Sequence, residues 1–227
     1  MSNLLSFSSI TKKIWMSLMG LFLVTFLLVH LTINLMVVFD PTRELFNVAA
    51  HFMGTNPLIQ IFQWVLFAGF IVHIILGVIL QIQNWIARPK GYKVTGSSEQ
   101  SFFSKYVIHT GVIIFVFLIL HFGHFFIKAK VFHEVPDFVL NGVNMGMEDM
   151  GLLIIQLFQI PGYVAFYVIG LLVVGFHLDH GIQSAFQSIG LNHKKYTPCI
   201  KTGGRILAIV ITVGYIFIPL AIYFKLV

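Results

Sequence analysis

Five long apolar runs dominate this sequence and decide what it can fold into. A helix needs about 20 apolar residues to cross roughly 30 Å of hydrocarbon, and apolar residues make up 58% of the chain. An outer-membrane barrel is excluded, because its strands alternate polar and apolar residues over about 10 positions. We therefore predict an all-α integral membrane bundle with a single transmembrane domain over residues 1–227. The expected spans are residues 14–39, 58–83, 106–127, 161–187 and 206–225.

Basic residues are shared unequally between the two sets of loops. Of the 14 Lys and Arg residues, ten lie before the first run or in the loops after the second and fourth runs. Since cytoplasmic loops carry the excess of positive charge, we expect the N-terminus in the cytoplasm and the C-terminus outside. The net charge of +6 thus comes mostly from residues of these loops and does not indicate a nucleic-acid-binding patch. The first run is too long for a cleavable signal, so we expect it to remain as a span.

The segment between the third and fourth runs is long and acidic. It ends in GLLIIQLFQ, which is too short to span a membrane and is separated from the fourth run by Pro161 and Gly162. Because proline favours the first turn of a helix, the fourth span should begin at Pro161. We expect a short interfacial helix before it.

One histidine lies deep in each of the first four apolar runs, and the fifth run has none. A polar ring in hydrocarbon costs several kcal/mol unless it has a partner. Counted from the expected start of its helix, each histidine is 16 or 17 residues along, which is about 25 Å at the rise of an α-helix. The four residues are His30, His73, His121 and His177.

Successive helices run in opposite directions, so equal counts predict two depths. His30 and His121 should lie toward the outer face, and His73 and His177 toward the cytoplasmic face, with about 10–20 Å between the levels. Two facing imidazoles suit a haem whose iron takes one nitrogen from each side. We therefore predict that the bundle encloses two b-type haems. With one cysteine, Cys199, and no C-x-x-C-H sequence, covalent attachment of the c type is excluded.

Glycines lie near two of these histidines and have two possible roles. Gly69 and Gly77 flank His73 four residues away on each side, and Gly181 follows His177 by four. A position without a side chain leaves room for a porphyrin beside the ligand. Small residues also let membrane helices pack closely, and the sequence does not separate the two roles.

Other histidines compete for these roles. His124 lies one turn beyond His121, and His180 lies one turn beyond His177. Any histidine inside a membrane can instead make an interhelical hydrogen bond or relay protons. The remaining histidines are expected in loops or at the interface: His51, His109, His133 and His193.

Four segments together resemble a known family. They look like the cytochrome b membrane anchor of succinate dehydrogenase and fumarate reductase, in its single-chain, five-helix, dihaem form. The resemblance covers all five spans, and its most specific parts are TG with LILH in the third run and the FHLDHG…SAFQSIG sequence of the fourth. The segments read LLVHLTINL, FIVHIILGVILQIQNW, HTGVIIFVFLILHFGHFF and FHLDHGIQSAFQSIGLNHKKYTP.

The resemblance implies the same histidine pairs and a role for the chain. The family's ligands fall on His30 and His121 for the haem distal to the catalytic subunits, and on His73 and His177 for the proximal haem. It implies a flavoprotein that interconverts succinate and fumarate and an iron–sulfur protein, both on the cytoplasmic face of a bacterial inner membrane. This chain would carry electrons between the iron–sulfur protein and a quinone, usually menaquinone, in the respiratory chain and tricarboxylic acid cycle. The succinate chemistry would lie in the partners.

The quinone and the haem propionates need polar groups near the membrane edge. Asn34, one turn beyond His30, and His124 are candidates for hydrogen bonds to a quinone. Candidates for the propionates are His180, Arg88, Lys194 and Lys195. Helix–helix hydrogen bonds and contact with lipid headgroups are the alternatives.

Two rival functions stay open. One is the haem b quinone-reactive subunit of another respiratory enzyme, such as a formate dehydrogenase or hydrogenase, which differs in its partners. The other is a haem-free transporter that uses histidines within the membrane. A transporter predicts a broken helix or an acid in mid-span, and the spans hold an acid only at Asp179, near the inner edge.

Overall fold

A computed structural model describes residues 8–87 and 106–226 of the chain. Within these ranges, five helical segments are long and apolar enough to cross a membrane. The prediction of an all-α, multi-pass membrane protein is therefore confirmed. The segments are α1 (Ser9–Phe39), α3 (Pro57–Ala87), Val107–Lys130, α8 (Pro161–Ser188) and α9 (Thr197–Tyr223). The third comprises α5 (Val107–Phe122), the π-helical turn η2 (Gly123–Ile127) and α6 (Lys128–Lys130).

The helices begin where the sequence supplies caps. The Ser8 hydroxyl accepts a hydrogen bond from the backbone N–H of Thr11 at the start of α1. The Asn56 side chain does the same for Leu58 at the start of α3, and Pro161 opens α8 as expected. The last helix starts at Thr197 and not near residue 206, because the polar segment before the apolar run is also helical and has a proline in its first turn.

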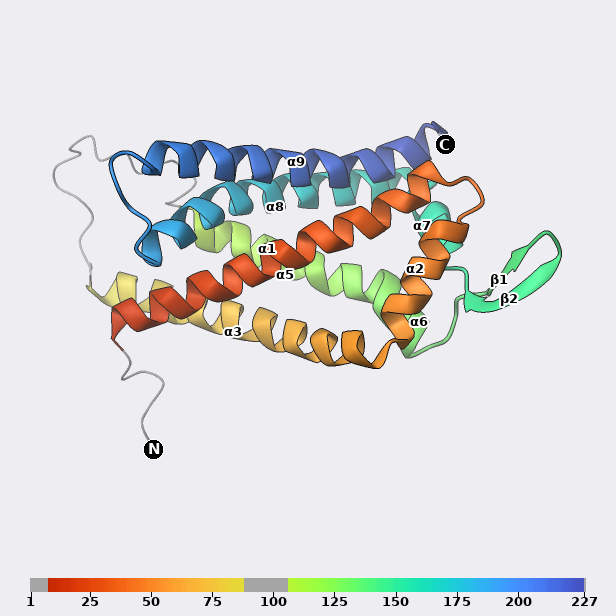
Figure 1. Ribbon diagram of the computed structural model, residues 1–227, viewed down its shortest axis with the longest axis horizontal. Helices are drawn as coiled ribbons and strands as arrows, with labels where there is room; N and C mark the ends of the chain where they lie inside the picture. Colours follow the sequence, from red (N-terminus) through yellow and green to blue (C-terminus); the bar gives the residue numbers. More distant parts are fainter. Residues whose placement is uncertain (1–7, 88–105, 227) are drawn as a thin grey trace.

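Four helices form a square, and the fifth packs outside it. In Figure 1 the long helices run roughly along the long axis of the molecule. α1 packs against α3 and α8, and α5 packs against α8 and, less extensively, α3. α1 and α5 therefore lie on one diagonal, and α3 and α8 on the other. α9 packs along α8 and α1 and completes the bundle.

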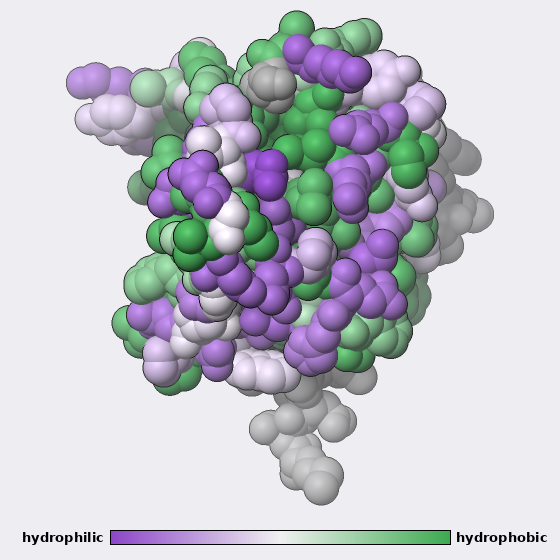
Figure 2. Space-filling model, turned by 90° about the vertical axis from the view of Figure 1, so that its right-hand side faces the viewer, coloured by the Kyte–Doolittle hydropathy of each residue, from purple (hydrophilic) through white to green (hydrophobic). Residues whose placement is uncertain are grey.

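One end of the bundle carries the short helices and strands of the described residues, and we call it the hairpin end. α2 (Glu44–Thr55) crosses it between α1 and α3, and α7 (Met150–Phe158) is the short helix expected before Pro161. The antiparallel strands β1 (Asp137–Leu140) and β2 (Val143–Glu148) project from it (Figure 1). Figure 2 faces this end and shows hydrophilic residues gathered across its middle among hydrophobic ones. The opposite end, which holds the start of α1, is called the N-side end.

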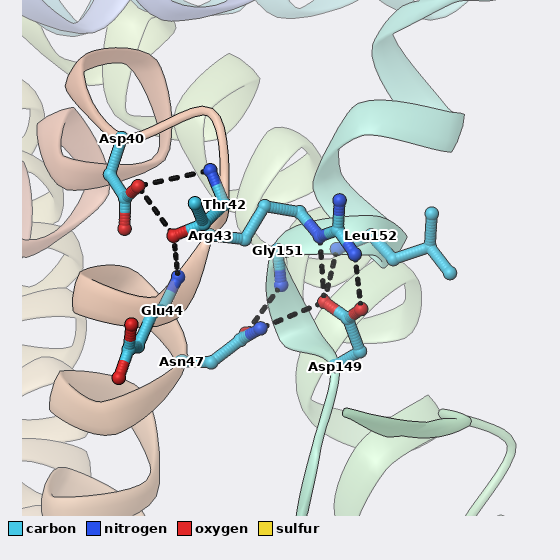
Figure 3. A network of polar contacts seen from close by, with 8 residues as sticks. All are labelled: Asp40, Thr42, Arg43, Glu44, Asn47, Asp149, Gly151 and Leu152. Atoms are coloured by element: carbon cyan, nitrogen blue, oxygen red, sulfur yellow. Dashed lines mark hydrogen bonds and ion pairs between the residues drawn. The ribbon is translucent and has the colours of Figure 1, made fainter. Parts of the chain in front are cut away.

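A buried polar network joins α2 to α7 at the hairpin end (Figure 3). The Arg43 guanidinium donates to both carboxylate oxygens of Asp149, at 3.2 and 2.9 Å. Asn47 is fully buried; its amide donates to Asp149 and its carbonyl accepts from the backbone N–H of Gly151, both at 2.9 Å. Asp149 also caps α7 by accepting from the N–H of Leu152. One carboxylate thus holds together two helices that are far apart in the sequence.

The largest apolar core lies under this network. It joins α1, α2, α7, α8 and α9, and a smaller cluster joins α8 to α9 toward the N-side end. Because α8 is fixed on one side by α9, its opposite side can face the interior of the square. Buried members of the large core include Val37, Phe46, Ile154, Phe158, Tyr167 and Ala221.

Candidate functional site

The four histidines of the first four spans form two pairs inside the square. His30 on α1 faces His121 on α5, with ring centroids 6.0 Å apart and ring planes at 90°. His73 on α3 faces His177 on α8, with centroids 6.2 Å apart and planes at 70°. Each pair therefore lies across one diagonal of the square. We call His30 and His121 the hairpin-side pair, and His73 and His177 the N-side pair.

Two glycines show how far apart the two levels are. A Cβ atom at Gly20 of α1 would lie 3.7 Å from Cε1 of His73, and one at Gly111 of α5 would lie 3.8 Å from Cε1 of His177. Both glycines are thus level with the N-side pair. Each precedes the hairpin-side histidine of its own helix by ten residues, 20 to 30 and 111 to 121. Ten residues of α-helix rise about 15 Å, which sets the spacing of the levels.

The ring spacing suits a metal bound between each pair. Two imidazoles on opposite sides of one metal ion, each at a bond length of about 2 Å, have centroids about 6 Å apart. Over residues 8–87 and 106–226, no group of three or more His, Cys, Asp or Glu residues could hold a metal ion. A metal at either pair must therefore bring most of its own ligands. A porphyrin iron, which needs one nitrogen on each face, meets that condition.

Two imidazoles in direct edge-to-face contact, with no metal between them, have a similar centroid spacing. The distinction between this contact and a metal site therefore depends on the ring nitrogens. His73 and His121 each have a buried Nδ1 atom without a hydrogen-bond partner in the described ranges. A buried polar atom without a partner costs about 1–3 kcal/mol and points to a missing ligand or water. Each level contains one such ring.

The other ring of each pair is fixed by a residue of the bundle. Nδ1 of His177 lies 3.1 Å from the Thr110 hydroxyl of α5. Nδ1 of His30 lies 3.3 Å from the Asn34 amide nitrogen, which donates to the backbone carbonyl of His30 at 2.7 Å. The Thr110 contact leaves Nε2 of His177 for a metal. At His30 the Asn34 amide can only donate, so in this contact Nδ1 of His30 accepts and the ring hydrogen is on Nε2. Asn34, a quinone candidate from the sequence, thus lies beside a proposed haem ligand.

Two of the glycines near His73 face α1. A Cβ atom at Gly69 would lie 3.1 Å from the ring of Phe22, and one at Gly77 would lie 3.4 Å from the end of Met16. These positions serve close packing of α1 on α3, which is the alternative role named above. Gly181 differs, because a Cβ atom there would meet nothing within 4 Å. The space beside this glycine is open.

His124 lies in the π-helical turn η2 and contacts two tyrosines of α8. Its Nδ1 atom lies 3.0 Å from the hydroxyl of the buried Tyr167 on α8. Its ring packs edge-on against Tyr163, 4.9 Å between centroids. Tyr167 also contacts the ring of His121 at 6.1 Å. Single π-helical turns often mark functional positions, and this one carries a histidine that is linked to the hairpin-side pair through Tyr167.

At the N-side end, Asp179 is already paired. Its carboxylate accepts hydrogen bonds from Gln183 at 2.8 Å and from Arg205 on α9 at 3.3 Å. His180, a propionate candidate, is half-buried next to it. Lys194 and Lys195 are exposed in the loop before α9. Arg88, the fourth propionate candidate, lies outside the described residues.

The remaining histidines do not join either pair. His51 is exposed on α2, where the sequence had suggested a loop, because α2 was not predicted. His109 is exposed in the first turn of α5. His133 and His193 lie in loops, as expected.

Several residues of the site were not predicted from the sequence. Thr110 contacts His177, Gly20 and Gly111 lie level with the N-side histidines, and Tyr167 contacts His121 and His124. The adjacent Thr110 and Gly111 form the TG of the third span, which supported the family resemblance. A depth count from His121 would have placed them at the level of His177.

Comparison with known proteins adds no relative. No protein-family model matches the chain, and no curated protein and no solved structure matches it.

Proposed function

We propose that the chain is a dihaem cytochrome b that anchors a succinate:quinone oxidoreductase in the membrane and carries electrons between an iron–sulfur subunit and a quinone. One observation carries the proposal: two histidine pairs lie on the two diagonals of a membrane bundle, about 15 Å apart along it. When bound, a haem at each pair supplies one-electron chemistry. The protein's own residues hold the ligands, exclude water with apolar helices and set the spacing.

The ends of the bundle support an orientation for this function. Among the described residues, six of the ten Lys and Arg residues lie toward the N-side end, and six of the seven Asp and Glu residues lie toward the hairpin end. By the positive-inside rule, the N-side end would face the cytoplasm, where the flavoprotein and iron–sulfur subunits would dock. The N-side pair would then be the first to receive electrons from succinate. His180, Lys194 and Lys195 remain the propionate candidates at this end, and Arg88, which lies outside the described residues, remains a candidate from the sequence.

The quinone site is proposed at the hairpin end, beside the pair that is farther from the docked subunits. A quinone carbonyl needs a hydrogen-bond donor next to an electron carrier. His124 is the first candidate: its Nδ1 is hydrogen-bonded to the Tyr167 hydroxyl, which leaves Nε2 to donate to a quinone, and the Tyr167 ring contacts His121. Asn34, one turn from His30, stays the second candidate. Menaquinone is the quinone that the family resemblance implies.

A reduced-minus-oxidised visible spectrum of the purified chain, with a haem-to-protein ratio, tests the proposal. We expect about two b-type haems per chain. His30→Ala and His121→Ala should each remove the same haem, and His73→Ala and His177→Ala the other. Loss of the same haem from the His30 and His73 variants would contradict the pairing. Absence of haem from the wild-type chain would favour the haem-free transporter.

Copurification separates the proposal from its nearer rival. If the chain holds two haems but copurifies with formate dehydrogenase or hydrogenase subunits, and not with a flavoprotein that oxidises succinate, the assignment as a dihaem cytochrome b stands. The assignment to a succinate:quinone oxidoreductase is then wrong. Succinate-dependent reduction of a menaquinone analogue by the purified complex is the expected result.

A further inference from the structure

The hydrogen bonds around Thr110 define the protonation pattern of one ring. The Thr110 hydroxyl lies 2.8 Å from the backbone carbonyl of Val107 and 3.1 Å from Nδ1 of His177. A hydroxyl has a single hydrogen and can accept through its lone pairs. A carbonyl oxygen can only accept, so the hydroxyl hydrogen is given to Val107. Toward His177, the Thr110 oxygen is therefore an acceptor, and Nδ1 of His177 must carry a hydrogen.

This arrangement selects one tautomer of the imidazole. A neutral histidine has one protonated nitrogen, and the bond made by one nitrogen decides which state the other has. With the hydrogen on Nδ1, Nε2 of His177 has a free lone pair in the interior of the square. That is the form in which an imidazole binds a metal.

His73, the other ring of this pair, has no such bond, because its buried Nδ1 has no partner in the described ranges. The two ligands of one level are thus unequal. We infer that Thr110 is a positioning residue that holds His177 in its metal-binding tautomer and makes His177 the stronger donor of the N-side pair. The inference rests on the proposed function, since it assigns Thr110 to the N-side haem.

Removing the bond should act on one haem. A hydrogen bond from the far nitrogen raises the basicity of a ligating imidazole, and loss of such outer partners typically weakens metal binding 10–100-fold. A more basic ligand stabilises the ferric state. In Thr110→Val, the side chain keeps its branched shape but loses the acceptor, so we expect a higher midpoint potential for the N-side haem. We also expect it to leave the protein about 10-fold faster.

The test compares Thr110→Val with Thr110→Ser, which keeps the hydroxyl. The readouts are a spectroscopic redox titration and the rate of haem transfer to an excess of an apo-haem protein, on the full chain. The N-side haem is identified by its absence in His177→Ala. Thr25→Val is the matched control, because the Thr25 hydroxyl makes only a bond to its own helix, with the carbonyl of Leu21 at 3.1 Å.

The expected result is a change confined to the N-side haem in Thr110→Val, with Thr110→Ser and Thr25→Val close to wild type. Unchanged potential and haem retention in Thr110→Val would overturn the inference, and so would an equal change in Thr25→Val. Nitrogen-15 NMR of haem-free protein with labelled histidines gives a second readout. We expect the Nδ1-protonated form of His177 in wild type and a mixture of tautomers in Thr110→Val. A wild-type chain that never binds haem but shows this tautomer would refute the proposed function and leave the Thr110 bond established.

Discussion

A Cβ atom at Gly111 would lie 3.8 Å from Cε1 of His177, a distance that accepts a methyl group and nothing larger. Gly111→Ala should therefore be tolerated, whereas the longer side chain of Gly111→Leu should push the imidazole from its position. We expect Gly111→Leu to lose the N-side haem and keep the other, as measured by the haem-to-protein ratio and the two-step redox titration.

Gly203→Leu is the control for that substitution, because a Cβ atom at this α9 position would meet nothing within 4 Å. It should retain both haems. A full haem complement in Gly111→Leu would show that α5 does not restrict the position of the His177 imidazole.

Asp149→Ala tests the polar network of the hairpin end. The variant leaves the Arg43 guanidinium and the buried Asn47 amide without their acceptor. Breaking a buried ion pair from one side costs about 3–5 kcal/mol. We expect a lower thermal unfolding midpoint and faster proteolysis between α6 and α7.

Asp137→Ala is the matched comparison. Asp137 also accepts a hydrogen bond from an asparagine, Asn144 at 2.8 Å, but it is exposed on the hairpin. Its loss should change stability by less than about 1 kcal/mol. Equal effects of the two substitutions would mean that the network does not anchor α7.

Asp149 should also make the stability of the hairpin end depend on pH. Burial alone would raise the pKa of Asp149, but the hydrogen bonds from Arg43, Asn47 and Leu152 and the charge of Arg43 hold the pKa below its usual range. Because the folded-state pKa is the lower one, the stabilisation is complete above about pH 4. It is lost as the pH falls through the folded-state pKa. Pepsin cleavage between α6 and α7 should therefore rise steeply in that range.

Asp149→Asn is the control for this dependence, since it cannot titrate. Its cleavage should start higher than that of wild type and vary less with pH. A wild-type profile that is flat from pH 5 to the most acidic pH at which the chain stays folded would contradict the prediction.

Tyr167→Phe should slow the exchange of electrons with quinone. The variant keeps the ring that packs on His121 but removes the hydroxyl bonded to His124. One hydrogen bond of about 1 kcal/mol corresponds to a roughly fivefold to tenfold effect. We expect a quinol-dependent haem reduction slower by that factor, with both haems present.

Tyr163→Phe is the companion variant, since it preserves the ring packed against His124. It should leave the rate within about twofold of wild type. An equal loss in both variants would point to a general disturbance of α8, and no loss in either would remove His124 from the quinone site.

The histidine pairing could be predicted from the sequence because the rise of a helix is nearly constant. Counting residues from the helix starts placed His30 opposite His121 and His73 opposite His177, and the structure has these contacts. The count predicts depth along a helix but says little about direction around it. Thr110 is found only when the direction of its side chain toward α8 is known.

The hairpin end was predicted less completely. The dipeptide Asn141–Gly142 joins β1 to β2 with positive φ values of 52° and 82°. Asn-Gly is a strong signal for such a turn, but short polar strands carry no clear alternation of apolar residues. α2 was missed for a different reason. It is short, and its buried residues, Phe46 and Asn47, find their partners in α7 and in other segments distant in sequence.

Diagonal pairing also sets an order of events during synthesis. The hairpin-side pair joins the first and third spans, and the N-side pair joins the second and fourth. No two consecutive spans contain a complete pair, so no ligand can bind between two paired histidines until α5 has entered the membrane. The N-side pair is complete one span later, when α8 has been inserted. α9 then packs against a bundle whose histidine pairs are already complete. The ribosome therefore delivers the two sites one after the other, with the hairpin-side site first.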